Sequence, residues 1–327
     1  MKVSVIATVL NNGDTVGQLL DSIFAQSRKP NEVIVVDGGS KDNTIEVLKE
    51  YEEKHANFKF YTHRLNKAQS RNFGIDKAKY SIIAQIDGSC KAQKHWLKRL
   101  IRPLSDEEVG VSAGFYKIVA RTAVSKAVTP YIGITQKMFD HRSYMPTGRS
   151  MAIRKHVWAE LQGYSEDLQW SGEDNLFNYK LLKKGIKIAR TPDALVYWYA
   201  PKTLKDVYGK IFSYTAGIAQ TGTWNHPCES LATVNTNVFS VYAKWFVGLV
   251  FLALSAYSMF FVYITILGFT MYTFSALWSK REQVEDQEAL MFVPLIQIIS
   301  DIAVMAGFAS GIIIPEGRHK RLRTAQT

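Results

Sequence analysis

Asp87 is the residue whose position most directly suggests chemistry. It ends the largely apolar run 82–86 and is followed at once by Gly88 and Ser89. A run of this kind that stops in a polar turn is typical of a buried strand that delivers one carboxylate to its C-terminal end. With the Ser89 hydroxyl one residue further on, that carboxylate could hold a divalent metal. The residues alone also allow a strand that simply ends in a turn.

Asp37 stands in a similar place, at the end of the apolar run 33–36. Gly38 and Gly39 follow it and let the backbone pass close to a ligand. A carboxylate fixed there can accept hydrogen bonds from the imide of a uracil or from the edge of a guanine. The alternative is an ordinary turn between a strand and a helix, in which Asp37 acts only as a cap.

Basic side chains follow at the start of a predicted helix over residues 67–78. Arg71 and Asn72 lie in its first turns, near the positive end of the helix dipole, which suits a diphosphate. Lys67 adds a further positive charge at the first turn. The alternative interpretation is a solvated basic helix without a ligand.

Two adjacent carboxylates, Glu173 and Asp174, open another predicted helix directly after Ser171 and Gly172. The helix macrodipole favours acidic residues in a first turn, which is a purely structural reason for both. The catalytic interpretation requires one carboxylate within hydrogen-bond reach of an acceptor hydroxyl, where it takes the proton of that hydroxyl as the oxygen forms a new bond.

The first hundred residues must position these side chains, and strand-like and helix-like patterns alternate there. The predicted strands are 2–10, 31–39, 58–63 and 80–88, and the predicted helices are 15–26, 44–54 and 67–78. This alternation predicts a doubly wound α/β fold with a mostly parallel sheet. Ligands in such sheets bind at the carboxyl ends of the strands. That rule singles out Asn11, Asp37 and Asp87.

The next hundred residues are less regular. Residues 101–200 are predicted to form the acceptor-facing half of the same domain, around a helix at 175–185. Residues 201–224 then contain a helix with one apolar face. This helix either packs on the protein core or lies on the surface of a bilayer. The predicted catalytic domain is therefore 1–224, with 1–100 as its nucleotide-binding half.

A membrane region is predicted over residues 225–315. The run 245–278 has no charge, amide, histidine or proline, and about 20 apolar residues suffice to cross a bilayer core. It is either one long tilted helix or a tight hairpin of two short spans. A second predicted span lies within 290–315 and carries Asp301, which should face protein or a polar cavity.

The basic tail 316–327 is predicted to be cytoplasmic by the positive-inside rule. If the catalytic domain faces the cytoplasm as well, the number of crossings is even. Two crossings are preferred, and a hairpin followed by a third span is the alternative. The prediction is a multi-pass protein of the cell membrane.

The net charge of +11 and the pI near 9.4 suit polyanionic partners, namely nucleic acid, anionic lipid or phosphorylated substrates. The basic residues are spread along the chain, and the tail adjoins a predicted span, so anionic headgroups explain it more simply than nucleic acid. No nucleic acid partner is therefore expected.

The two cysteines, Cys90 and Cys228, have no metal-ligand spacing and do not suggest a disulfide framework, so a reducing compartment is expected.

Taken in this order, the four polar elements resemble the family 2 inverting glycosyltransferases of the GT-A fold, over roughly residues 1–224. The resemblance implies that the segment "VIATVLNN" cradles a nucleotide base and that Asp37 binds it. It also implies a diphosphate near the pair Arg71 and Asn72. The residues that we predict to bind the nucleotide-sugar are Thr8, Leu10, Asn11, Asp37, Lys67, Arg71, Asn72, Asp87 and Gly88.

The resemblance further implies a divalent metal, Mg²⁺ or Mn²⁺, bound by Asp87. Ser89 stands where the family has a second aspartate, and it could reach the metal through its hydroxyl or a water. Asp174 carries over as the general base, with Glu173 beside it. The residues predicted to line the acceptor or sugar pocket are Arg149, Tyr164, Trp170, Gln220 and Trp224.

The order of a catalytic domain before membrane spans also resembles exopolysaccharide-type and polyprenyl-phosphate sugar transferases. The implied reaction is an inverting in-line transfer from a UDP- or GDP-sugar to a lipid-linked or glycan acceptor. One alternative is a polyprenyl-phosphate hexose synthase, whose anionic acceptor needs no general base. An alternative of another class is a catalytically silent membrane scaffold that binds nucleotide-sugar. The segment "QTGTW" resembles the Gln-x-x-Arg-Trp of processive synthases, but Thr223 replaces the arginine and no processivity is inferred.

Overall fold

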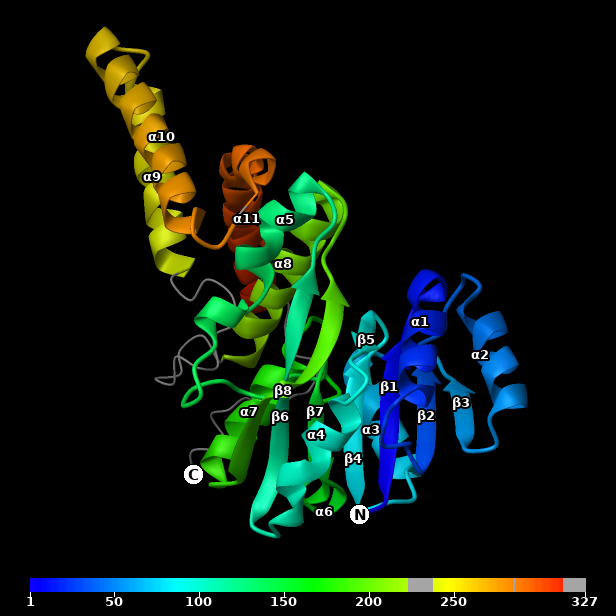
Figure 1. The fold of residues 1–327 in the computed structure, drawn as a ribbon. Helices are drawn as coiled ribbons and strands as arrows, with labels where there is room; N and C mark the ends of the chain where they lie inside the picture. The colour runs from blue at the N-terminus through cyan, green and yellow to red at the C-terminus, as the bar shows by residue number, and fades with distance from the viewer. Residues whose placement is uncertain (223–237, 285, 314–327) are drawn as a thin grey trace. The chain divides into compact units, whose positions relative to one another are not determined.

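The computed structural model describes residues 1–222, 238–284 and 286–313 (Figure 1). The chain divides into two compact units. The first consists of Met1–Val119 and Asp140–Tyr199, and the second of Ala120–Phe139 and the residues from Ala200 onward. The helix that follows Pro201 therefore groups with the second unit, whereas the sequence-based division kept it with the catalytic domain.

The amino-terminal half of the first unit alternates strands and helices, as the sequence predicted. The strands are β1 (Val3–Val9), β2 (Glu32–Asp37), β3 (Phe58–Thr62) and β4 (Ile82–Asp87), and the helices are α1 (Gly13–Phe24), α2 (Thr44–Lys54) and α3 (Lys67–Lys77). These four strands are parallel to one another. Nearly every residue of β1, β2 and β4 is buried, because both faces of this part of the sheet are covered.

The other half of the unit completes one eight-stranded sheet of order β3-β2-β1-β4-β7-β6-β8-β5. The strands are β5 (Cys90–Ala92), β6 (Val109–Val119), β7 (Met151–Arg154) and β8 (Lys187–Tyr199). The helices are α4 (Trp96–Ile101), α6 (Lys155–Glu160) and α7 (Glu173–Lys183), with a short 3-10 turn at Arg102–Ser105. Strand β7 runs antiparallel to both β4 and β6, and β5 runs antiparallel to β8. The sheet is therefore mixed, with a parallel half that carries the predicted nucleotide loops.

Strand register aligns the ends that bear the predicted ligands. Thr8 of β1 pairs with Asp87 of β4, and Val9 pairs with Asp37 of β2. Gly88 packs against the end of β1, where an added Cβ would lie 2.8 Å from the Asn12 side chain. Because glycine has no side chain, the turn after β4 can stay close to the first loop.

Helix α3 lies unusually close to the sheet. A Cβ on Gly74 would lie 2.7 Å from Ile6 of β1. Buried residues of α3 and α7 join β1, β2 and β4 in one apolar cluster that also includes Tyr164 and Val157. This packing fixes α3 and α7 on the sheet, and both carry predicted site residues at their amino ends.

The second unit is helical. Its helices are α5 (Ala123–Ile132), α8 (Leu204–Thr221), α9 (Val238–Leu254), α10 (Met259–Lys280) and α11 (Gln287–Ile313), with a short 3-10 turn at Gln136–Met138. Helices α8 and α11 approach closely, because Gly307 and Gly311 face the carbonyl groups of Phe212 and Ala216. Small residues at four-residue spacing are a common means of bringing two helix backbones together in membranes.

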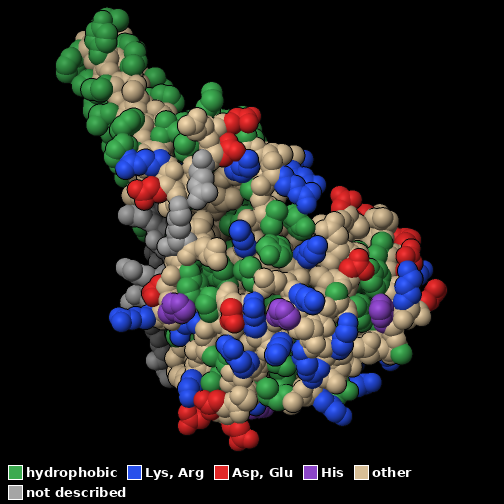
Figure 2. Space-filling model, viewed as in Figure 1, with side chains coloured by type: hydrophobic (Ala, Val, Ile, Leu, Met, Phe, Trp, Pro, Cys, Tyr) green, Lys and Arg blue, Asp and Glu red, His purple; other side chains and the backbone are tan. Residues whose placement is uncertain are grey.

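The apolar run 245–278 forms a hairpin rather than one long helix. Helix α9 ends at Leu254 and α10 begins at Met259. Ring contacts join Phe251 to Phe261 and Trp245 to Tyr272, so the two helices are antiparallel. Hydrophobic side chains cover the surface of this hairpin in Figure 2. By length and composition, α10 and α11 are apolar enough to cross a membrane, and α9 is a shorter apolar helix.

Candidate active site

The guanidinium of Arg71 is the centre of an ion-pair cluster that brings three predicted elements together. Its Nη2 atom lies 2.8 Å from Oδ1 of Asp87. Its Nη1 atom lies 2.9 Å from Oε1 of Glu173 and 2.5 Å from Oδ1 of Asp174. Only 2% of the Arg71 side chain is exposed. We call Arg71, Lys67, Asp87, Glu173 and Asp174 the Arg71 cluster.

Lys67 supplies the second cation of the cluster. Its Nζ atom lies 3.2 Å from Oδ2 of Asp87 and 3.5 Å from Oε1 of Glu173. It is the first residue of α3, whose start is fixed by a capping box between Asn66 and Gln69. The side chain of Lys67 is 45% exposed, so this cation has one face in solvent.

The three carboxylates are held by different elements. Asp87 ends β4, whereas Glu173 and Asp174 form the first turn of α7. The backbone N–H of Gly172 donates to Oε2 of Glu173 at 3.0 Å. The backbone N–H of Gly148 donates to Oδ2 of Asp174 at 3.1 Å. Each carboxylate therefore has a fixed direction before any ligand binds.

The cations keep the buried acids ionised. Burial alone would raise the pKa of the Asp87 and Glu173 carboxyls, because it disfavours the charged form. The positive charges of Lys67 and Arg71 outweigh burial, so the pKa of Asp87 falls well below its usual range and that of Glu173 falls to about 2. Burial likewise favours a neutral Arg71, but the carboxylates raise the pKa of its guanidinium further still. Asp87, Glu173 and Arg71 are therefore charged at neutral pH.

Gly148 contributes to the cluster and was missed by the sequence analysis. An added Cβ at this position would lie 1.9 Å from Nη2 of Arg71, so only glycine allows the guanidinium its place. Nothing local in the sequence marks this glycine, because the contact joins residues far apart in the chain. Tyr164, predicted to line a sugar pocket, is buried instead, with its ring 5.3 Å from Cζ of Arg71 and its hydroxyl donating to Gln85.

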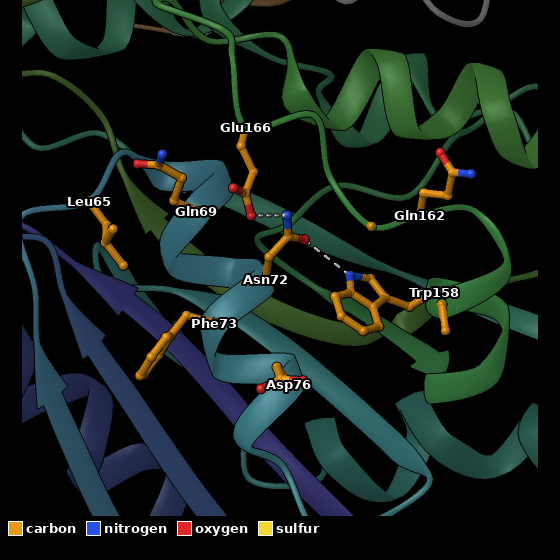
Figure 3. Close-up of a pocket in the computed structure, with 10 residues that line it drawn as sticks. Leu65, Gln69, Asn72, Phe73, Asp76, Trp158, Gln162 and Glu166 are labelled. Carbon is orange, nitrogen blue, oxygen red and sulfur yellow. Dashed lines mark hydrogen bonds between the residues drawn. The ribbon is translucent and has the colours of Figure 1, made fainter.

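Asn72 lies between Glu166 and Trp158 and is hydrogen-bonded to both (Figure 3). Its Oδ1 atom accepts the indole N–H of Trp158 and the backbone N–H of Tyr164. Its Nδ2 atom donates to the carbonyl of Tyr164 and to the carboxylate of Glu166. These bonds lie at a pocket of about 590 Å³ whose lining includes Gln69 and Asp76 of α3 but no residue of the Arg71 cluster. The structure thus places Asn72 where it fastens the segment 163–166 to α3, and not beside Arg71 in the cluster.

The loops after β1 and β2 are tied to each other. The carboxylate of Asp37 accepts the backbone N–H groups of Gly39 and Ser40, and also the Ser40 hydroxyl. The side chain of Asn11, a residue with φ of 52°, accepts the backbone N–H of Lys41 at 2.8 Å. Asp37 thus caps its own turn, and its contact with a nucleotide base stays a prediction. Thr8 and Leu10 lie in the same region, and Leu10 is 54% exposed.

The remaining predicted pocket residues belong to different parts of the chain. Arg149 lies over two aromatic rings, with Cζ 4.1 Å from the Trp198 ring and 4.8 Å from the Tyr116 ring. Its charge also helps to lower the pKa of Asp87, after Lys67 and Arg71. Trp170 lies half-buried in the segment before α7. Gln220 belongs to α8 of the second unit, and Trp224 and the tail 316–327 fall outside the described residues.

The donor set suits a divalent metal whose remaining ligands come from a diphosphate. Within the described residues, no group of three or more His, Cys, Asp or Glu side chains is arranged to hold a metal. Asp87 offers one carboxylate and Ser89 a half-buried hydroxyl in the turn that follows. Mg²⁺ and Mn²⁺ accept one or two carboxylates when phosphate and water oxygens complete the octahedron. The residues therefore fit such a metal, provided that a nucleotide supplies the other oxygens.

Comparisons with known proteins point in one direction. Residues 4–159 match the model of glycosyl transferase family 2, and residues 116–280 match that of glycosyl transferase family group 2. The chain is 29% identical over 116 residues to glycosyltransferase AglE of Haloferax volcanii, which covers 34% of this chain and 38% of that relative. The match therefore spans well under two thirds of that relative's own length.

A longer match is to a Methanococcus voltae protein named dolichyl N-acetyl-alpha-D-glucosaminyl phosphate 3-beta-D-2,3-diacetamido-2,3-dideoxy-beta-D-glucuronosyltransferase. It is 24% identical over 230 residues, 65% of this chain and 72% of the relative. Among solved structures, the fold is similar to that of mannosyltransferase PcManGT from Pyrobaculum calidifontis, in complex with GDP-Man and Mn²⁺. The TM-score is 0.59 at 15% identity, and the similarity covers 93% of this chain and 87% of the other.

Proposed function

The chain belongs to glycosyl transferase family 2 and is a glycosyltransferase, and from that premise we propose a specific reaction for it. It transfers a sugar from a UDP- or GDP-sugar to a lipid-linked or glycan acceptor, with inversion at the anomeric carbon. It acts at the cytoplasmic face of the cell membrane. The observation that carries this proposal is the Arg71 cluster.

The cluster joins residues that are far apart in the sequence at the carboxyl end of β4. Arg71 comes from α3, Asp87 from β4, and Asp174 from α7. A buried cluster with three carboxylates and two cations is unfavourable as a purely structural device, because charges lose their hydration when they are buried. These groups are explained if the cations bind a charged sugar donor and a carboxylate accepts the proton of a reacting hydroxyl. Perturbed ionisable groups of this kind concentrate at active sites.

Asp174 is the residue that we assign as general base. Its carboxylate is 25% exposed, whereas those of Asp87 and Glu173 are 12% and 6% exposed. An acceptor hydroxyl can therefore reach Asp174 most easily. As the acceptor oxygen forms its bond to the anomeric carbon, its proton passes to Asp174 and the bond to the diphosphate oxygen breaks. Glu173, with its lowered pKa, is a poor proton acceptor and holds Arg71 in position.

The departing nucleoside diphosphate gains negative charge, and the two cations of the cluster lie at the end of β4 to attract it. A divalent metal held by Asp87, with Ser89 near it, would neutralise part of that charge when bound. Lys67 and Arg71 have an additional role before the reaction, since they keep Asp87 ionised.

The second unit supports an acceptor at the membrane. Helices α10 and α11 are long and apolar enough to cross a bilayer, and the hairpin of α9 and α10 exposes large apolar side chains. The name of the relative from Methanococcus voltae describes transfer to a dolichyl-linked sugar phosphate. A membrane-attached enzyme has direct access to an acceptor of that kind.

The test is sugar transfer by the full chain in detergent or native membranes. A panel of UDP- and GDP-sugars is first screened for thermal stabilisation of the protein, with and without Mn²⁺. Transfer of the labelled sugar from the selected donor to a lipid extract is then measured. We expect Asp174→Asn to lower the transfer rate by about 10²-fold to 10⁴-fold, because general base catalysis contributes that much. Glu46→Gln, which removes an exposed first-turn carboxylate from α2, serves as the matched control and should leave the rate unchanged.

Three results would contradict the proposal in different ways. If Asp174→Asn transferred sugar to the lipid-linked glycan at the wild-type rate, the base assignment would be wrong. If the variant were fully active with polyprenyl phosphate and the wild type used that acceptor, the chain would be a polyprenyl-phosphate hexose synthase. Absence of transfer and hydrolysis with every donor, despite donor binding, would support the scaffold alternative.

A further inference from the structure

The two oxygens of the Asp87 carboxylate are both bonded to cations of the protein itself. Arg71 binds Oδ1 at 2.8 Å and Lys67 lies 3.2 Å from Oδ2. Lys67 also lies 3.5 Å from Glu173, so its ammonium sits between two carboxylates. This is the environment that a bound cation would have. A metal can therefore bind Asp87 closely through Oδ2 only if Lys67 leaves.

We propose that Lys67 competes with the divalent cation for Asp87, so that the metal binds well only together with the nucleotide. This inference rests on the proposed function, because it concerns the metal and the diphosphate of the same site. With no donor bound, the Lys67 ammonium occupies the position beside Asp87 and free metal binds weakly. When a nucleoside diphosphate enters, its oxygens attract the ammonium and supply the remaining ligands for the metal.

The two cations differ in their freedom to move, so only one of them can give way to the metal. Arg71 is 2% exposed and is confined by Gly148, whose backbone leaves no room for a side chain, and by the ring of Tyr164. Lys67 is 45% exposed and has a flexible stem that ends in a compact charge. Arg71 is thus the fixed cation of the cluster and Lys67 the movable one.

Charge also argues for coupled binding. A divalent ion that arrived without a nucleotide would lie beside Lys67 and Arg71, with Arg149 near enough to influence Asp87. Repulsion between like charges in a partly buried site opposes such binding. Ser89, in the turn after Asp87, is neutral and brings no second carboxylate to compensate for this repulsion. A diphosphate brings the missing negative charge, so the metal and the nucleotide bind better together than either binds alone.

The experiment is a titration of the detergent-solubilised full chain with Mn²⁺. Binding is measured by calorimetry or by the electron paramagnetic resonance signal of the free ion. It is performed without nucleotide and again with GDP or UDP, whichever stabilises the protein. We expect the wild type to bind Mn²⁺ at least about tenfold more weakly without nucleotide than with it. Lys67→Met should raise the affinity for Mn²⁺ alone by about tenfold, since it removes a partly screened charge next to the ion.

Three further variants make this result specific. Lys67→Arg keeps the positive charge and should keep the weak binding of Mn²⁺ alone. Lys77→Met removes an exposed lysine from the other end of α3 and should behave as the wild type does. Adding Asp87→Asn to Lys67→Met should abolish the gain, because the carboxylate that holds the ion is lost.

Equal Mn²⁺ affinities for the wild type and Lys67→Met, in the absence of nucleotide, would overturn the inference. So would the absence of Mn²⁺ binding to both proteins with the nucleotide present. These readouts involve no sugar transfer. A failure of the proposed reaction would therefore appear in the transfer assay, whereas a failure of this inference would appear in the titration.

Discussion

Asp87 in the first unit and Asp301 in the second are both buried carboxylates on regular elements, yet different groups face them. Asp87 is bonded to the cations Arg71 and Lys67. Asp301 is 0% exposed and accepts hydrogen bonds from the neutral side chains of Trp245, Tyr272 and Gln297. Lys244 lies further off, 3.8 Å from Oδ2, and is half exposed.

The donors to Asp301 come from three helices. Trp245 lies on α9, Tyr272 on α10 and Gln297 on α11 itself, and Gln297 also accepts the hydroxyl of Tyr131 on α5. Hydrogen bonds from neutral groups can satisfy a carboxylate without a mobile counter-ion, which suits a joint between helices in an apolar setting. In the Arg71 cluster, by contrast, the partners of Asp87 are cations, and a charged ligand can compete for them. The difference suggests that Asp301 holds helices together, whereas Asp87 is kept ready for a ligand.

The largest effect should come from removing the fixed cation of the Arg71 cluster. Arg71→Ala leaves Asp87, Glu173 and Asp174 close together without the guanidinium. We expect the free energy of unfolding to fall by about 3–5 kcal/mol, as happens when one partner of a buried ion pair is removed. Thermal unfolding of the full chain in detergent, followed by near-ultraviolet circular dichroism, measures the change.

Arg102→Ala is the matched control for this measurement. Arg102 is 72% exposed and lies 3.9 Å from Asp193, so its removal should change stability by less than about 1 kcal/mol. A loss for Arg71→Ala as small as that of the control would show that the cluster is not energetically coupled. The contrast with Asp301 would then have no energetic basis.

An intermediate effect should appear at Asp301, and it should depend on hydrogen bonding more than on charge. Asp301→Leu leaves the donors of Trp245, Tyr272 and Gln297 without their acceptor. Because these hydrogen bonds are only partly buried, we expect the free energy of unfolding to fall by about 1–3 kcal/mol in total. Asp301→Asn keeps one oxygen for Trp245 and Tyr272, and the amide of Gln297 can turn to accept from the new NH₂. We expect a lowered thermal midpoint for Asp301→Leu and a midpoint near that of the wild type for Asp301→Asn.

The same neutralisation at Asp87 sharpens the contrast. Asp87→Asn removes the charge that faces Arg71 and Lys67, so it should abolish sugar transfer, whereas Asp301→Asn should retain it. Equal loss of activity in the two asparagine variants would contradict the different roles that the contacts suggest.

The smallest effect should be that of pH on the stability of the first unit, because it appears only in acid. The folded chain keeps Glu173 ionised down to about pH 2, whereas an unfolded glutamate takes up its proton near pH 4.5. The lowered pKa values of Glu173 and Asp87 therefore contribute stability above about pH 4.5, and that stability is lost as the pH falls further. We expect the thermal midpoint to be flat from pH 7 to pH 5 and to fall steeply below that range.

Arg71→Lys provides the comparison for this pH series. A lysine cannot form the forked contacts of the guanidinium, so the pKa values of the carboxyls should lie closer to normal. The acid-dependent decline of the thermal midpoint should then be smaller than in the wild type and should level off at a higher pH, because less stability depends on the ionised carboxyls. An identical pH dependence in the two proteins would contradict the assignment of Arg71 as the cation that holds these acids ionised.

Much of the first unit follows from local sequence patterns. The predicted strands over 2–10, 31–39, 58–63 and 80–88 and the helices between them all occur, because buried apolar runs and amphipathic periods determine both. Arg71, Asp87, Glu173 and Asp174 were each identified from their place at the end of a strand or the start of a helix. The break in the run 245–278 could not be located, since residues 255–258 include neither proline nor charge.

The sequence by itself determined the order of the elements, the family resemblance and the residues able to carry charge. Only the tertiary structure decided which of those residues meet. Successive residues of a helix point about 100° apart, so Arg71 enters the cluster while its neighbour Asn72 binds Tyr164 and Trp158 instead. The fit of Gly148 against Arg71 and the position of Lys67 beside Asp87 depend on packing between segments distant in the chain. Such contacts leave no local pattern, because burial and repulsion act across the fold and not along the sequence.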